Sequence, residues 1–135
     1  MPPAPASTSS LALRLRLQRN GEIILGPGRA DLLTHIAQTG SIAAAGRRMG
    51  MSYKRAWILV DSLNATFRQP LVLATKGGAG GGGARLTPLG EHLLAAYRAL
   101  EAATASAGAA HLSEIEAALA VPPAPKASYD APNDH

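Results

Sequence analysis

Hydrophobic and polar residues alternate strictly at the start of the chain. Every second position of this run is a leucine: Leu11, Leu13, Leu15 and Leu17. This period of two is typical of a half-buried β-strand. Asn20-Gly21 follows and favours the type I′ turn, in which both residues have positive φ, and residues 22–25 (EIIL) then form the returning strand. The pattern therefore predicts an N-terminal β-hairpin.

The spacing changes to that of a helix after Gly26-Pro27-Gly28. From Arg29 onward, Leu32, Leu33 and Ile36 share one helical face. Gly40 is placed to end this helix in the left-handed conformation. Asp31 is expected in the first turn, where the helix dipole favours a carboxylate.

Two further helices follow almost without a gap. Ser41 is a natural N-cap for a short helix at residues 42–49, and Ser52 caps a longer one from Tyr53 to about Arg68. A tight break at Gly50-Met51 separates the two helices. Two helices joined by a short turn that contains glycine are typical of a helix-turn-helix, although an ordinary helical hairpin has the same spacing.

The first turn of the longer helix favours the helix-turn-helix interpretation. Polar and aromatic residues gather at the end that points into the major groove in this motif: Ser52, Tyr53, Lys54, Arg55 and Trp57. Lys54 and Arg55 are expected to contact bases and phosphate, in an order that the residues do not assign. Trp57 can instead fold back into the core, since a lone tryptophan is usually largely buried. Ser41 is a further candidate DNA contact.

A glycine-rich segment after Pro70 predicts the wing. Residues 71–75 and 84–86 read as strands on either side of a glycine loop from Lys76 to Gly83. The loop contains G-x-G-x-x-G, but a nucleotide site needs a helix that starts within the glycines, and here a strand follows. The candidate backbone contacts, through charge and unobstructed N–H groups, are Lys76, Gly77, Gly78, Gly80 and Arg85. A slack hairpin loop with no ligand is the alternative.

The last apolar stripe predicts a long helix that pairs with a second copy. Thr87-Pro88 is a helix start, with Thr as the cap and Pro at the first helical position. The predicted dimerisation residues lie on one face: Leu89, Leu93, Tyr97 and Leu100. The helix is expected to span about residues 87–120, with a possible interruption at Gly108. One small domain cannot bury so long a face, so we expect a homodimer, helped by the N-terminal hairpin.

The positive charge of the chain indicates which class of ligand it binds. The chain has 135 residues and a formal net charge of +4, and residues 40–90 contain seven Lys or Arg against the single acid Asp61. Such a field suits a polyanion such as duplex DNA. Residues 1–10 and 121–135, rich in Pro, Ala and small polar residues, are predicted to be disordered tails around one domain at residues 11–120.

The sequence contains no pattern typical of a disulfide-rich protein, a metal-binding protein, an enzyme or a membrane protein. The absence of cysteine excludes disulfides and thiolate metal sites, and the four histidines lack metal-ligand spacing. No nucleophile, base and orienting group converge, so we expect no enzyme, metal or cofactor. Without a signal-peptide pattern or a membrane-spanning apolar run, the expected location is cytoplasmic.

Residues 40–57 and 77–87 together resemble a known family. Gly40-Ser41-Ile42, Ser52-Tyr53-Lys54-Arg55-Ala56-Trp57 and the glycine run through Thr87 closely resemble the N-terminal DNA-binding domain of ModE-type molybdate-responsive regulators. The helix-turn-helix more distantly resembles that of LysR-type regulators. The resemblance implies a mainly α winged helix-turn-helix dimer that binds palindromic operator DNA, often upstream of molybdenum-uptake genes. It also implies a recognition helix at Ser52–Trp57 and a wing at Lys76–Arg85.

One departure from this family changes the expected signal. Full-length ModE-type proteins carry a C-terminal β-rich domain that binds molybdate, whereas residues after 120 here are Pro-rich. Direct molybdate binding is therefore expected to be absent. The alternative function is a protein-interaction module that uses the same fold to modulate another regulator; it predicts salt-insensitive binding to protein and feeble affinity for DNA.

Overall fold

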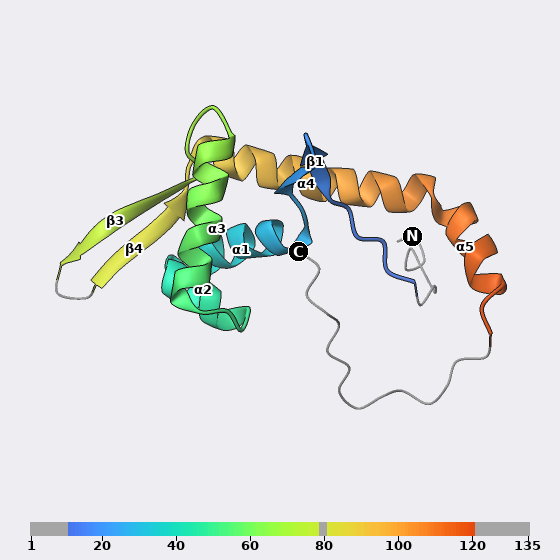
Figure 1. Cartoon of the computed structure of the whole chain (residues 1–135), viewed down its shortest axis with the longest axis horizontal. Helices are drawn as coiled ribbons and strands as arrows, with labels where there is room; N and C mark the ends of the chain where they lie inside the picture. Colours follow the sequence, from blue (N-terminus) through green and yellow to red (C-terminus); the bar gives the residue numbers. More distant parts are fainter. Residues whose placement is uncertain (1–10, 79–80, 121–135) are drawn as a thin grey trace, which may run out of the picture. The chain divides into compact units, whose positions relative to one another are not determined.

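The computed structural model describes residues 11–78 and 81–120, which divide into two units. The folded unit runs from Arg14 to Leu100, and the second unit includes Leu11–Leu13 and residues 101–120. In chain order the elements are β1 (Leu17–Arg19), β2 (Glu22–Leu25), α1 (Pro27–Thr39), α2 (Ile42–Arg48), α3 (Tyr53–Thr66), β3 (Val72–Gly78), β4 (Gly81–Leu86), α4 (Pro88–Ala107) and α5 (Ala109–Ala117) (Figure 1). The tails predicted at 1–10 and 121–135 lie outside the described residues.

The N-terminal hairpin is confirmed, but its first strand is shorter than predicted. Asn20 and Gly21 have φ of 52° and 84°, as the predicted turn requires, and β2 has the predicted bounds. The strand begins only at Leu17, and the register shifts directly after it. Upstream, the Leu15 carbonyl accepts a 2.7 Å hydrogen bond from the Tyr97 hydroxyl instead of pairing with β2. The predicted strand from Leu11 is therefore wrong, because a contact distant in sequence takes the backbone group.

Helix α1 starts at Pro27, two residues before the predicted start at Arg29. Proline suits this first helical position, since its missing N–H is not needed there. Asp31 consequently lies beyond the first turn, which contains no acid, and the prediction of a dipole contact is wrong. The Asp31 carboxylate instead accepts a 2.9 Å bond from Arg98. At the other end, Gly40 has φ of 70° and donates its N–H to the Ile36 carbonyl, which confirms the predicted cap.

Helices α2 and α3 form the predicted helix-turn-helix. Ser41 accepts a 3.0 Å bond from the Ala44 N–H, and Ser52 accepts a 3.0 Å bond from the Arg55 N–H. Gly50 has φ of 69° in the turn between them. A Cβ built at Gly46 would lie only 3.2 Å from the Ala56 Cβ, so the two helices approach closely at small residues.

One hydrophobic core holds the folded unit together. Helices α1 to α3 each contribute one buried face, and the strands and α4 cover the remainder. The largest side chains that are almost completely buried are Tyr97, Leu32, Leu33, Ile36, Leu63, Leu71 and Val60. Burial of each such side chain contributes about 1.5–3 kcal/mol, so the core fixes the position of α3.

The wing is a longer hairpin than predicted. Strands β3 and β4 are antiparallel and leave the helices as an arm (Figure 1). Gly77 and Gly78 lie in β3, and residues 81–83 lie in β4, so most of the predicted glycine loop is strand. The glycine backbone pairs across the hairpin, and Thr75 adds a side-chain bond at 3.1 Å from the Gly83 N–H. Gly80 lies outside the described residues.

The base of the wing is tied to the helices by hydrogen bonds. The Asn64 side chain accepts from the Leu71 and Val72 N–H groups at 2.8 and 3.1 Å, and it donates to the Val72 carbonyl at 3.0 Å. The Ala84 N–H donates to the Gly40 carbonyl at 2.8 Å. These bonds attach both strands of the wing to the helix-turn-helix.

Helix α4 begins as predicted. The Thr87 hydroxyl accepts from the Gly90 N–H at 2.9 Å and donates to the Pro70 carbonyl at 2.8 Å. Gly108 separates α4 from α5, at the position where an interruption was expected. Among residues 11–78 and 81–120, no helix combines the length and apolar character that crossing a membrane requires.

Candidate nucleic-acid interface

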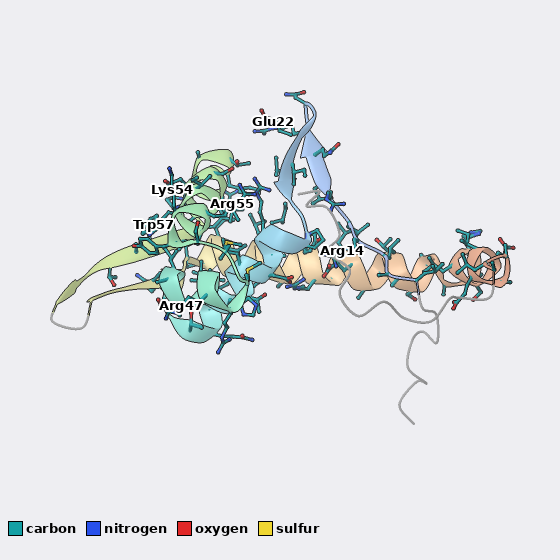
Figure 2. The ribbon with its side chains drawn as sticks, turned by 60° about the horizontal axis from the view of Figure 1, so that its bottom comes forward. Arg14, Glu22, Arg47, Lys54, Arg55 and Trp57 are labelled. Atoms are coloured by element: carbon teal, nitrogen blue, oxygen red, sulfur yellow. The ribbon has the colours of Figure 1, made fainter. Side chains whose placement is uncertain are left out.

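The first turn of α3 displays its polar side chains to solvent. Ser52, Tyr53, Lys54 and Arg55 are all exposed, and Tyr53 retains 60% of its accessible surface. The opposite side of α3 is buried through Ala56, Leu59, Val60 and Leu63. Because that face is fixed in the core, the side chains of the first turn project away from the fold. Figure 2 shows Lys54, Arg55 and Trp57 on this helix.

Trp57 packs against the core, which is one of the two roles considered for it, and its role in DNA contact stays a prediction. It is half-buried and packs against the core, but its ring also meets the exposed Tyr53 ring edge-on, with centroids 6.3 Å apart and planes at 82°. Such edge-to-face pairs are favourable beyond the area they bury. Trp57 therefore anchors Tyr53 at the start of α3.

Helix α2 adds cations next to this surface. Arg47 and Arg48 occupy its last turn and are exposed. Arg48 donates a 2.9 Å hydrogen bond to the Gln38 side chain on α1. Ser41, a predicted DNA contact, uses its oxygen to cap α2, but a hydroxyl keeps one donor for another partner.

Arg29 is a cationic residue that the sequence analysis did not select. Burial lowers the pKa of its guanidinium, and the positive charge of Arg55 lowers that pKa further. In the described part of the chain, no carboxylate forms an ion pair with either arginine. Both lie in the first turn of a helix, where the dipole disfavours a cation.

The wing brings the predicted backbone contacts onto one hairpin. Lys76, Gly77 and Gly78 belong to β3, and Arg85 is exposed on β4 opposite Leu73. Over the described ranges, with 79–80 left out, no three side chains of the metal-binding types gather into an ion site.

The predicted dimerisation face is only partly available. Tyr97 is 2% exposed and bonded to Leu15, so its assignment to a dimer contact is wrong, because the folded unit itself uses this side chain. Leu89 and Leu93 pack partly against the same core. Leu100 remains 40% exposed.

Comparison with known proteins agrees with this architecture. Residues 29–91 match the model of the bacterial regulatory helix-turn-helix proteins of the lysR family. The chain is 47% identical over 108 residues to the molybdenum-pterin-binding protein MopB of Rhodobacter capsulatus, covering 80% of this chain and 38% of MopB.

The chain is also similar to proteins named ModE. The chain is 39% identical over 89 residues to the DNA-binding transcriptional dual regulator ModE of Escherichia coli K12, covering 66% of this chain and 33% of ModE. It is 40% identical over 88 residues to the molybdenum transport protein ModE of Azotobacter vinelandii, covering 65% of this chain and 33% of that protein. The matched part is therefore well under half of each relative. Residues 29–91 thus match a LysR-type helix-turn-helix domain, and the chain is similar over 89 to 108 residues to the ModE and MopB proteins.

Proposed function

We propose that the chain is a sequence-specific DNA-binding transcription regulator that reads bases with the start of α3. The observation that carries this proposal is the exposed first turn, Ser52 to Arg55, on a helix whose other face is fixed in the core. In helix-turn-helix proteins the N-terminal residues of the second helix contact base edges in the major groove. Lys54 suits guanine acceptors there, and the Tyr53 hydroxyl both donates and accepts.

Cations around this turn supply the phosphate contacts of the proposal. Arg29 and Arg55 lie close enough to repel each other, and a phosphate between them removes that repulsion. Arg47 on α2, labelled in Figure 2, and Arg85 on the wing are also exposed and are further candidates for phosphate contacts. The backbone N–H groups of the glycines offer further donors where the wing nears the duplex.

A homodimer on a palindromic operator completes the proposal. Helix α5 buries none of its side chains; Ile115 on this helix and Leu119, two residues after its end, are 57% and 52% exposed. Apolar side chains of this size suit a contact with the same residues of a second copy. Replacing both by Asp is expected to give a monomer in sedimentation velocity whose circular dichroism spectrum is that of the folded chain. Wild-type chain that is monomeric at micromolar concentration would contradict the dimer.

The regulated genes are proposed to serve molybdenum uptake or use. The names of the relatives associate them with molybdenum transport and molybdenum-pterin binding. Direct molybdate binding is not part of the proposal for this chain. Calorimetric titration with molybdate is expected to give no heat of binding.

Selection of bound fragments from the source genome tests the function. Purified chain is incubated with fragments at about 150 mM salt, with and without molybdate, and the enriched DNA is footprinted. We expect a palindrome with half-sites about one helical turn apart. With about six to ten phosphate contacts, the affinity falls roughly a thousandfold between 50 and 200 mM salt. Lys76→Ala is expected to weaken all sequences alike.

The opposite result has a definite meaning. Absence of enrichment over random fragments would contradict the DNA-binding function. Salt-insensitive binding to a protein would then favour the interaction-module alternative, in which the long helix captures a protein partner.

A further inference from the structure

Ile58 is an apolar side chain exposed on the proposed reading surface. It lies on α3 and retains 48% of its accessible surface. Residues three and four positions apart share a helix face, so Ile58 lies one turn beyond Arg55 and Lys54. Ile58 therefore lies on the same face of α3 as the exposed cations Lys54 and Arg55.

The fold makes little use of this side chain. The buried face of α3 consists of Ala56, Leu59, Val60 and Leu63, and Ile58 falls outside it. Isoleucine is also a poorer helix former than alanine or the long polar residues, because its β-branch loses rotamer freedom. Neither core packing nor helix propensity therefore explains an isoleucine at this site.

A single exposed hydrophobic residue is ordinary, but Ile58 is not isolated on α3. Among the residues of the folded unit whose side chains are described, four large apolar ones are substantially exposed, and two of them, Tyr53 and Ile58, belong to this helix. The half-buried Trp57 lies between them in sequence and contacts Tyr53. The reading surface thus combines cations with apolar area.

The chemistry of the major groove identifies an occupant for that area. Bases present hydrogen-bond donors and acceptors in the groove, and the one apolar group among them is the C5-methyl of thymine. A helix rises about 5.4 Å per turn, which corresponds to between one and two base steps of about 3.4 Å. Ile58 therefore reaches a base pair next to those that Lys54 and Arg55 approach.

We propose that Ile58 contacts a thymine methyl, which makes an A·T pair a required part of each half-site. This inference rests on the proposed function, since it assumes that α3 enters the major groove. It adds a specificity-determining residue that reads by apolar contact, beside the polar readers of the first turn.

Replacement of thymine by uracil tests the contact, because uracil lacks only the C5-methyl group. The probe is the duplex most enriched by the full chain from a random library, synthesised either with thymine or with deoxyuridine throughout the footprint. Affinities for both duplexes are measured for the wild type, Ile58→Ala, Ile58→Val and Leu73→Ala. Leu73 is the matched control, since it is 39% exposed but lies on β3.

Removal of one buried methyl group corresponds to a loss of about fourfold in affinity, so the loss of one methyl contact in each of the two half-sites gives about fifteenfold. We expect this loss for the wild type, Ile58→Val and Leu73→Ala, and equal affinity for both duplexes with Ile58→Ala. Equal wild-type affinity for the two duplexes would overturn the inference, as would an undiminished loss with Ile58→Ala. If the library yields no enriched duplex, the proposed function itself fails. Circular dichroism melts verify that each variant is folded.

Discussion

The two ends of α3 have opposite relations to the rest of the molecule. At its beginning, Tyr53, Lys54 and Arg55 are exposed and lie outside the hydrophobic core. Near its end, Asn64 uses its carbonyl oxygen twice and its amino group once to hold residues 71 and 72 of the wing. The two ends of α3 therefore have different roles. The hydrogen bonds near its end hold the helix in place, and this leaves the side chains at its start exposed for contact with a ligand.

The largest expected effect is on the stability of the fold, at the contact between α4 and the segment before β3. A Cβ at Gly90 would collide with the Leu71 backbone carbonyl. Overpacking against backbone is not relieved by a rotamer change, so we expect Gly90→Ala to destabilise the fold by about 3 kcal/mol. Urea denaturation measures the change. Gly28→Ala is the control, because a Cβ there meets nothing within 4 Å, and a loss of stability equal to that of Gly90→Ala would contradict the packing argument.

A smaller loss is expected for Asn64→Ala, which removes three hydrogen bonds at the base of the wing. Leaving partly buried backbone groups without these partners costs about 2 kcal/mol. Asn64→Asp keeps the acceptor for both N–H groups but loses the donor, and we expect an intermediate stability in the same denaturation experiment. If Asn64→Ala is as stable as the wild type, the wing is held by its strand pairing alone.

The caps of the two helix-turn-helix helices give the smallest expected effect on stability. Ser52→Ala removes the acceptor for the Arg55 N–H, and the loss of such a cap costs about 1 kcal/mol. Ser41→Ala, which loses the bond from the Ala44 N–H, is the matched comparison and is expected to cost the same. DNA binding separates the two variants: we expect the stronger loss of affinity for Ser52→Ala, because its helix start is the reading end. Equal losses of affinity would contradict this distinction.

Features that depend on a few neighbouring residues were predicted from the sequence. The Asn20-Gly21 turn, the Ser41 and Ser52 caps and the Thr87-Pro88 helix start all follow from local backbone chemistry. These preferences act within one turn of chain, so the pattern of residues is sufficient to locate them.

Features that depend on distant partners were not predicted. The hydroxyl of Tyr97 reaches the Leu15 carbonyl, 82 positions away in sequence, and this contact both shortens the predicted strand and removes Tyr97 from the dimer face. The proximity of Arg29 to Arg55 also depends on how α1 packs against α3. Ile58 was missed for another reason: exposure of an isoleucine becomes visible only when the buried face of its helix is known.

The central claim, that the start of α3 reads DNA, is tested most directly by comparing Lys54→Ala with Arg68→Ala. Both changes remove one exposed cation, but Arg68 follows the far end of the same helix. The measurement is the ratio of affinities for the selected operator and a scrambled duplex at about 150 mM salt. We predict that Lys54→Ala lowers this discrimination by roughly 1 to 3 kcal/mol, the value of one base contact, and that Arg68→Ala leaves it unchanged. Equal discrimination in the two variants would contradict the assignment of α3 as the reading helix.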